Sequence, residues 1–417
     1  MHQPTLAHTF ADALPDMAVP LPGTQVPGAE LIVLNEPLAR ELGLDPDWLR
    51  SPEGVAWLAG SAGGHATAYS GHQFGQFVPV LGDGRALLLG DTNGREIQLK
   101  GSGLTPFSRP GSDGLGAIGP MLREYLISEF MHAIGIPTTR SLAVIRTGEK
   151  VVRQQGQVPA GIVVRTASSH LRVGSLQYAA QKSRDLVADV IAAAGFDGPE
   201  RLLDTVIHKQ VDLVSRWMSV GFVHGVMNTD NVALSGETID YGPCAFTQRF
   251  DGAASFSSID AQRRYAFGNQ PSILAWNMVR LAETLLPELG QERAQEILST
   301  MQTRWDTAWE TYIGDLADAL AQADDITTFN REHGMIFGGG TAFEYGDAPD
   351  GSPYPGPIYI PRNHMLQDAI NAAERDGDFG AYLALLAAVT DPYNPDAGEE
   401  WMAQPEKPGP FRTFCGT

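Results

Sequence analysis

Short apolar runs separated by glycine-rich turns fill the chain up to residue 175. The runs at 86–89 and 97–100 flank Asp91-Thr92-Asn93-Gly94, and this pattern predicts a β-hairpin. Three further runs have the length and composition of strands, at 142–145, 151–152 and 161–165. The first part of the chain is therefore predicted to be rich in β-structure.

Longer helical patterns lie between these runs and after them. Pro120 begins a segment whose apolar residues recur every three or four positions until Gly135, which predicts a helix. A second amphipathic pattern runs from 201 to 221. Residues 1–60 are rich in Pro and Gly around a helical patch at 37–44, so we expect an arm that wraps a domain. Further helices are predicted near 272–287, 290–322, 364–376 and 380–389. Together these patterns predict an α+β protein.

The stretch 224–246 concentrates polar side chains around two very short apolar runs. Residues 232–239 are predicted to form a small hairpin. Its start would then hold Asp230 and Asn231, and its end would hold Asp240. Carboxylate and amide oxygens at two neighbouring strand ends suit Mg²⁺ or Mn²⁺ with a phosphate ligand. A hairpin that merely has polar turn residues is the simpler alternative.

The order of these residues is typical of a nucleotide site. Protein kinases carry a catalytic Asp, a metal-binding Asn and a second metal-binding Asp before Gly. Here Asn231 follows Asp230 directly, and Asp240-Tyr241-Gly242 replaces the usual Asp-Phe-Gly. Kinases separate the first two residues, so their adjacency argues against ordinary phosphate transfer.

Two earlier segments add groups that bind phosphate. The turn Gly82-Asp83-Gly84 would let backbone N–H groups approach phosphate oxygens closely, although most such turns are only turns. Lys100 ends a predicted strand and could bind phosphates as a point charge. Glu124, on the predicted helix, could pair with Lys100 as in a kinase small lobe, or it could be a solvated helix residue.

The charge of the chain makes clustered cations informative. With 29 basic and 49 acidic residues the net charge is -20, which argues against nucleic-acid or anionic-membrane partners. In so acidic a chain, Arg165 and Arg172, 7 residues apart, are interpreted as a phosphate clamp, with two surface arginines as the alternative.

Targeting signals are lacking in this sequence. No apolar run approaches the roughly 20 residues of a membrane span. The first residues lack the basic and apolar regions of a signal peptide, so we expect a cytoplasmic protein without membrane partners. The 2 cysteines, Cys244 and Cys415, are too few for a disulfide framework, and their positions alone allow two unrelated thiols.

Long ordered motifs over nearly the whole chain resemble the selenoprotein O family. They are Gly71-His72-Gln73-Phe74-Gly75, Leu81-Gly82-Asp83-Gly84-Arg85, Leu99-Lys100-Gly101-Ser102-Gly103-Leu104-Thr105-Pro106, Met227-Asn228-Thr229-Asp230-Asn231, Asp240-Tyr241-Gly242-Pro243, Asn269-Gln270-Pro271, Pro361-Arg362-Asn363-His364 and Thr413-Phe414-Cys415-Gly416-Thr417. The resemblance implies a kinase-like (pseudokinase) fold with two lobes that binds ATP in a flipped orientation. It implies transfer of AMP to Ser, Thr or Tyr hydroxyls of other proteins.

The resemblance also assigns roles to residues. Asp230 would be the base, Asn231 and Asp240 would hold Mg²⁺ or Mn²⁺, and Glu124 would orient Lys100. The ATP-binding residues would be Gly82, Gly84, Arg85, Lys100, Asp113, Gly114, Arg165, Arg172 and Asp240. After Asp113-Gly114 the sequence departs from the usual family pattern. The family further implies a regulatory disulfide between Cys244 and Cys415, which would act as a redox switch.

We therefore expect a monomeric protein adenylyltransferase with an arm at 1–60, a β-rich lobe at 61–175 and a helical lobe at 176–417. Two alternatives remain open. One is a kinase-type phosphotransferase, because the site residues overlap. The other is a catalytically inactive, ATP-binding scaffold that responds to redox state. Whether ATP yields pyrophosphate or ADP separates these hypotheses.

Overall fold

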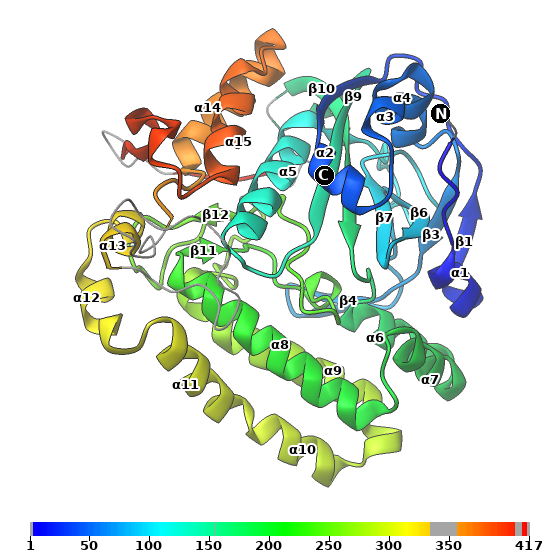
Figure 1. Ribbon diagram of the computed structural model, residues 1–417. Helices are drawn as coiled ribbons and strands as arrows, with labels where there is room; N and C mark the ends of the chain where they lie inside the picture. Colours follow the sequence, from blue (N-terminus) through cyan, green and yellow to red (C-terminus); the bar gives the residue numbers. More distant parts are fainter. Residues whose placement is uncertain (1–2, 155, 334–356, 405–410, 415–417) are drawn as a thin grey trace.

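The structure is a computed structural model that describes residues 3–154, 156–333, 357–404 and 411–414. A twisted sheet made by the first part of the chain lies beside a group of helices made by the second part (Figure 1). The α+β class expected from the sequence is confirmed by this arrangement.

Within the described ranges, eight strands form one antiparallel sheet in the order β1-β3-β6-β7-β10-β9-β2, with β8 pairing to β10. The strands are β1 (Ala18–Leu21), β2 (Glu30–Leu34), β3 (Gly64–Thr67), β6 (Ala86–Thr92), β7 (Arg95–Lys100), β8 (Gly116–Ala117), β9 (Arg140–Arg153) and β10 (Gly156–Ala167). Two small pairs lie apart from this sheet, β4 (Gly71–Gln73) with β5 (Gln76–Val78) and β11 (Phe222–Val223) with β12 (Ala245–Phe246).

The β6–β7 hairpin is confirmed at its predicted turn. Asn93 and Gly94 both have positive φ, 47° and 74°, which a tight turn between two twisted strands requires. Beyond the turn the register pairs Ala86 with Lys100, so the hairpin ends at the lysine. On its other side β7 pairs with β10, where Gln98 lies directly opposite Arg165.

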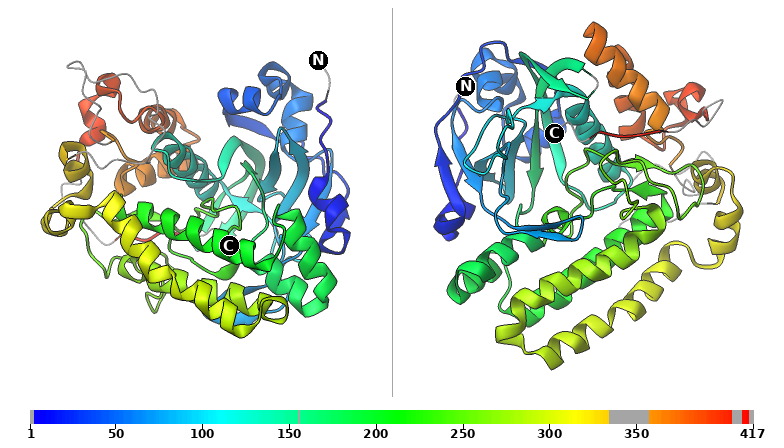
Figure 2. Two further views of the ribbon diagram at one scale, coloured as in Figure 1. Left: turned by 60° about the horizontal axis from the view of Figure 1, so that its bottom comes forward. Right: turned by 180° about the vertical axis from the view of Figure 1, so that it is seen from behind.

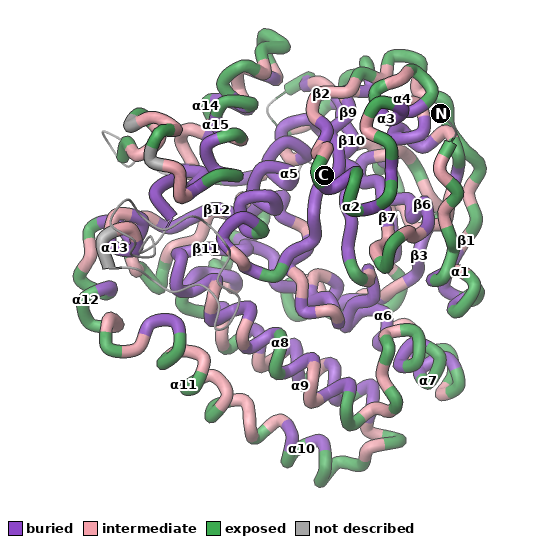
Figure 3. The backbone as a smooth tube through the Cα atoms, viewed as in Figure 1, coloured by how far each residue is buried: buried purple, intermediate pink, exposed green. Residues whose placement is uncertain are grey.

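Helix α5 (Ile118–Ala133) is the predicted helix that begins near Pro120. It packs on β9 and β10 with one face and on α14 (Asn363–Asp376) and α15 (Gly380–Thr390) with another, so it is buried almost all round (Figure 3). Gly135, at φ 76°, follows its end. This central position fixes Glu124 rigidly.

The second half is mainly helical, as predicted. The helix expected at 201–221 is α8 (Pro199–Ser219), which packs against α9 (Gln270–Leu289) and α11 (Met301–Tyr312) (Figure 2). The single helix expected at 290–322 is divided into three, α10 (Gln291–Ser299), α11 and α12 (Ala317–Gln322). The remaining helices here are α6 (Val173–Lys182), α7 (Arg184–Ala193) and α13 (Ile326–His333). None of the helices in the described ranges combines the length and apolar character that a bilayer span needs.

The N-terminal residues take part in the sheet. Strands β1 and β2 occupy its two edges, and α2 (Glu36–Glu41), α3 (Pro46–Arg50) and α4 (Pro52–Leu58) cover one face. A separate apolar core forms there between helical Trp48 and Trp57 and strand residues such as Leu99. The short helix α1 (Thr9–Ala13) lies near β6. The larger core joins α5 to the helices of the second half.

Candidate active site

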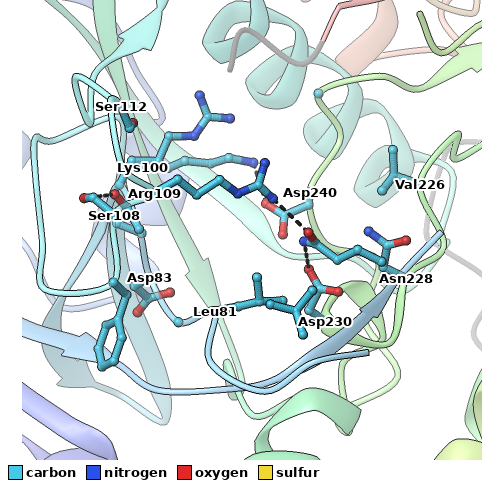
Figure 4. Close-up of a pocket in the computed structure, with 18 of the residues that line it drawn as sticks. Leu81, Asp83, Lys100, Ser108, Arg109, Ser112, Val226, Asn228, Asp230 and Asp240 are labelled. Carbon is cyan, nitrogen blue, oxygen red and sulfur yellow. Dashed lines mark hydrogen bonds and ion pairs between the residues drawn. The ribbon is translucent and has the colours of Figure 1, made fainter. Parts of the chain in front are cut away.

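A cavity of about 1290 Å³ opens between the end of the sheet and the stretch 224–246. Lys100 and Asp83 come from the sheet side, whereas Asp230, Asn228 and Val226 come from the opposite side (Figure 4). The cavity lining also includes Gly82, Gly84, Arg85, Asp113, Arg165, Arg172, Asn231 and Asp240. Most of the residues singled out in the sequence therefore face one space.

Lys100 and Glu124 form the predicted ion pair. The ammonium of Lys100 donates to Glu124 Oε2 at 2.6 Å, and the Glu124 side chain is 1% exposed. The helix α5 is held by packing on both sides, so the carboxylate keeps the lysine at the end of β7. The alternative of a solvated helix glutamate is wrong.

Asp240 is the point on which three cations converge. Lys100 bonds its Oδ1, Arg165 Nη1 donates to the same oxygen at 2.7 Å, and Arg172 Nη1 donates to Oδ2 at 3.1 Å. Burial alone would raise the pKa of Asp240, but the charges of Arg165, Lys100 and Arg172 hold it well below its usual range. The residue adopts a φ of 67°, a left-handed conformation that costs a non-glycine residue ~1–2 kcal/mol.

The two arginines lie deep in the cavity wall rather than on the surface. The Arg165 side chain is 2% exposed and also bonds Glu124 Oε1 at 2.9 Å. The Arg172 side chain is 3% exposed, donates to the backbone oxygen of Asp230 at 2.8 Å and lies over the ring of Tyr69 at 4.6 Å. Two buried guanidinium groups that face one cavity are suited to a polyanion.

Asp230 is buried on the 3₁₀ turn Thr229–Asn231. Burial raises the pKa of its carboxyl to about 6. Gln73 donates to Oδ2 at 3.2 Å, while Oδ1 is buried without a partner among the described residues. Asp230 lines the cavity, so its carboxyl group is placed where it can accept a proton from a hydroxyl.

A bridge of two side chains reaches Asp230 from the glycine-rich loop. Arg109 Nη2 donates to Gln73 Oε1 at 2.8 Å, and the amide nitrogen of Gln73 donates to Asp230 Oδ2. The contact joins the loop to the β4–β5 hairpin across the cavity. Gln73 was part of a recognised motif, but its neutral side chain gave no signal of this contact in the sequence.

The side chain of Asn231 has an amide oxygen of the kind that coordinates Mg²⁺ or Mn²⁺. Its Nδ2 donates to the Val226 backbone oxygen at 2.9 Å, which fixes the amide and leaves its oxygen for another partner. In the described ranges no group of three or more His, Cys, Asp or Glu side chains could hold a metal ion. An ion held by Asp240 and Asn231 would need ligand oxygens as well, as Mg²⁺ at nucleotide sites commonly does.

The hairpin predicted at 232–239 is wrong, although Asp230, Asn231 and Asp240 do line one cavity. Ala233 instead bridges to Arg172, and Thr238 bridges to Thr138. Each short segment therefore completes its backbone hydrogen bonds with a different neighbour, because a run of two or three residues cannot form a stable hairpin alone.

The two glycine segments differ in what they offer a ligand. Gly82 has a φ of 73°, and a side chain there would overlap the ring of Phe107, so the tight turn requires glycine. Asp113 is paired with Arg153 at 2.7 Å, which lowers the pKa of its carboxyl. Gly114 lies against Gly103 too closely for any side chain. The second segment is thus tied to the end of β9 by an ion pair.

The C-terminal segment 411–414 reaches the wall of the cavity. Thr413 Oγ1 donates to the backbone oxygen of Pro243 at 2.6 Å, and Thr413 pairs with Ser257. Cys244, next to Pro243, is buried. Cys415 lies outside the described residues.

Known proteins are similar to this chain over nearly its whole length. A sequence model of the family described as protein adenylyltransferase SelO matches residues 4–316. The protein nucleotidyltransferase YdiU of Mycolicibacterium smegmatis is 45% identical, with 99% of this chain and 98% of the relative covered. YdiU of Mycolicibacterium paratuberculosis is 46% identical with the same coverage, and YdiU of Rhodopseudomonas palustris is 46% identical over 94% of this chain and 95% of the relative.

Proposed function

Because the chain belongs to the SelO family, we propose that it is a protein adenylyltransferase that moves AMP from ATP to a Ser, Thr or Tyr hydroxyl of a target protein. The observation that carries this proposal is that Lys100, Arg165 and Arg172, which converge on Asp240, line the same cavity as Asp230. The cations match a polyphosphate, and the carboxylate matches an incoming hydroxyl.

The roles follow from the chemistry of AMP transfer. Asp230 accepts the proton of the acceptor hydroxyl while the hydroxyl oxygen forms a bond to the α-phosphorus. The bond from the α-phosphorus to the oxygen that bridges the α- and β-phosphates breaks. Pyrophosphate leaves with that electron pair. Lys100, Arg165 and Arg172 stabilise the charge of the leaving group, and Glu124 holds Lys100 in place.

A divalent cation is part of this proposal. Asn231 and Asp240 would hold Mg²⁺ or Mn²⁺, which when bound neutralises charge on the phosphates. The glycine turn at Gly82, Gly84 and Arg85 would line the nucleotide, as would Asp113, since all four line the cavity. Gly114 follows Asp113 and is proposed to contact the nucleotide through its backbone.

The proposal extends to the architecture and to regulation. A two-lobed kinase-like fold, with an arm at 1–60 and lobes at 61–175 and 176–417, is supported by a sheet and a helical group on either side of the cavity. A redox disulfide between Cys244 and Cys415 is supported by the hydrogen bond from Thr413 to Pro243. Air oxidation should then lower the mass of the intact chain by two hydrogens, and Cys244→Ser should abolish that change.

The direct test uses ATP labelled at the α- or the γ-phosphate, with the reduced protein, Mg²⁺ and a cell lysate. We expect label from the α-position on protein, with an added AMP mass on Ser, Thr or Tyr. Label from the γ-position alone would assign kinase chemistry instead. ATP binding with neither label would favour the scaffold.

The first prediction concerns the base. Asp230→Asn should lower AMP transfer at least ~100-fold, because a general base contributes typically 10²–10⁴-fold. ATP affinity should stay within about threefold, since the phosphate-facing cations remain. Asp189→Asn, at an exposed position on α7, is the matched control and should keep wild-type transfer. Equal transfer by Asp230→Asn and wild type would remove Asp230 from this role.

A further inference from the structure

A row of buried polar side chains lies behind the cations of the cavity. Gln98 is two residues before Lys100 on β7, and residues two apart on a strand point to the same face. Gln98 is 0% exposed and stands directly opposite Arg165 in the register of β7 and β10. Asp83, 1% exposed, lies on the far side of Gln98.

Gln98 connects the other two side chains through opposite ends of its amide. Its Oε1 accepts two hydrogen bonds from Arg165, from Nε at 3.0 Å and from Nη2 at 2.7 Å. Its Nε2 donates to Asp83 Oδ2 at 3.1 Å. The reverse orientation would set the amide NH₂ group against a guanidinium and the amide oxygen against a carboxylate, so only one orientation satisfies both neighbours.

Asp83 is itself held firmly. Thr67 donates to Asp83 Oδ2 from its backbone nitrogen at 2.9 Å and from its hydroxyl at 2.7 Å. The carboxylate therefore cannot turn away from Gln98 without losing three hydrogen bonds. The remaining arginine nitrogen, Nη1, bonds Glu124 and Asp240, so every nitrogen of Arg165 has an acceptor.

We infer that Asp83 and Gln98 are positioning residues that lock the guanidinium of Arg165 in the orientation that receives the polyphosphate of ATP. The inference rests on the proposed function, in which Arg165 binds the nucleotide. Asp83 sets the direction of the Gln98 amide, and the amide oxygen sets the plane of the guanidinium through two hydrogen bonds. An arginine fixed in advance loses less conformational freedom when the ligand binds.

The alternative is that Gln98 only fills space in the sheet. The two readings differ in which ligand they affect. A positioning role weakens binding of ligands that carry a polyphosphate and spares adenosine, whereas a packing role lowers stability and affects all ligands alike. The dissociation constants of ATP and adenosine, measured by calorimetry beside the unfolding temperature, separate them.

Gln98→Glu is the informative variant. It keeps an acceptor for Arg165 but turns a carboxylate oxygen toward Asp83, so the two like charges must move apart. We expect ATP binding to weaken ~10-fold, a change typical of coupled neighbours. Adding Asp83→Asn removes one of the two like charges while its amide oxygen still accepts from Thr67, so the double variant should return to within about threefold of wild type. Asp83→Asn alone should have a smaller effect, because its amide oxygen can still accept from Gln98.

Gln210→Glu provides the matched control, since Gln210 is also buried, 3% exposed, and bonds the Ala233 backbone oxygen. It should lower the unfolding temperature without changing the ratio of ATP to adenosine affinity. A double variant no better than Gln98→Glu, or an equal loss for ATP and adenosine, would overturn the inference. If the variants change ATP affinity as expected but the wild-type protein transfers no AMP, the proposed function is overturned and the inference about Gln98 and Asp83 is not.

Discussion

Asp240 carries an unusual combination of properties for a single residue. Its backbone is in the left-handed region, and its carboxylate accepts hydrogen bonds from Lys100, Arg165 and Arg172. Three cations held so close together would repel one another without this anion. The carboxylate therefore keeps them assembled, and under the proposed function the phosphates of ATP would share that charge.

His224 gives a pH-dependent prediction at the same scale. It is fully buried, bonds the Ile239 backbone oxygen through Nε2 at 2.9 Å and accepts from the Val226 N–H at Nδ1. Burial lowers its pKa below the ordinary 6.5. Below pH 6.5 the imidazole therefore binds a proton in the unfolded chain more readily than in the folded chain. The contribution of neutral His224 to the free energy of unfolding is complete above pH 6.5 and is lost as the pH falls below it.

The measurement is urea unfolding between pH 7.5 and pH 5. His224→Gln, which keeps a donor for Ile239, should flatten the decline in stability by up to about 1.4 kcal/mol per pH unit. His208→Gln, at an exposed position on α8, is the control and should leave the decline unchanged. Parallel curves for wild type and His224→Gln would show that another group controls acid stability.

At the scale of elements, the β4–β5 hairpin lies against the turn that carries Asp230. A side chain at Gly71 would come within 2.4 Å of Asp230 Oδ1. Gly71→Ala should therefore push the carboxylate aside and lower AMP transfer at least ~10-fold, because a misplacement of about 1 Å can cost 10²-fold in rate. ATP affinity should change little, since the cations are untouched.

Gly198→Ala is the matched control, because a side chain at Gly198 meets no atom within 4 Å. Its transfer rate should equal that of wild type. A Gly71→Ala protein with normal transfer would mean that the hairpin does not constrain Asp230.

Elements with a strong local signal could be predicted from the sequence. The β6–β7 hairpin has its turn residues Asn93 and Gly94, and α5 has an apolar stripe between Pro120 and Gly135. The pair at 232–239 could not be predicted correctly, because its hydrogen bonds go to Leu171 and Pro137, far away in the sequence. Helices α6 and α7 were missed because their apolar faces are short.

The candidate site divides in the same way. Lys100 and Glu124 could be singled out because a strand-end Lys and a helix Glu match the pattern of a kinase small lobe. Arg165 could be singled out because paired cations are informative in so acidic a chain. Gln98 and Gln73 could not, since a neutral amide is read from sequence as an ordinary polar residue. Their roles depend on which neighbours the fold supplies, Asp83 for one and Arg109 for the other.

At the scale of the whole molecule, a buried ion pair joins the helical half to the segment before α14. Arg362 bonds Asp325 with two parallel hydrogen bonds, at 3.0 and 2.9 Å, and both side chains are almost fully buried. Asp325→Ala would leave the Arg362 charge without its partner, so we expect a loss of about 3–5 kcal/mol in the free energy of unfolding. Urea unfolding monitored by circular dichroism measures it.

The double variant Asp325→Leu with Arg362→Met should recover at least half of that loss, because no charge is then buried alone. A double variant as unstable as Asp325→Ala would instead assign the loss to the Asp325 hydrogen bond with Thr328 at the start of α13 (2.6 Å). AMP transfer at 25 °C should be retained in the double variant, since the pair lines no part of the cavity.

The hydrogen bond from Thr413 to Pro243 has a consequence for folding during translation. The two residues are 170 positions apart, and a ribosome produces the chain from the N-terminus at about 5–20 residues per second. After Pro243 has been synthesised, on the order of ten seconds or more thus pass before Thr413 is available to bond it. A nascent chain can therefore contain every candidate site residue and still lack the hydrogen bond that supports this wall of the cavity.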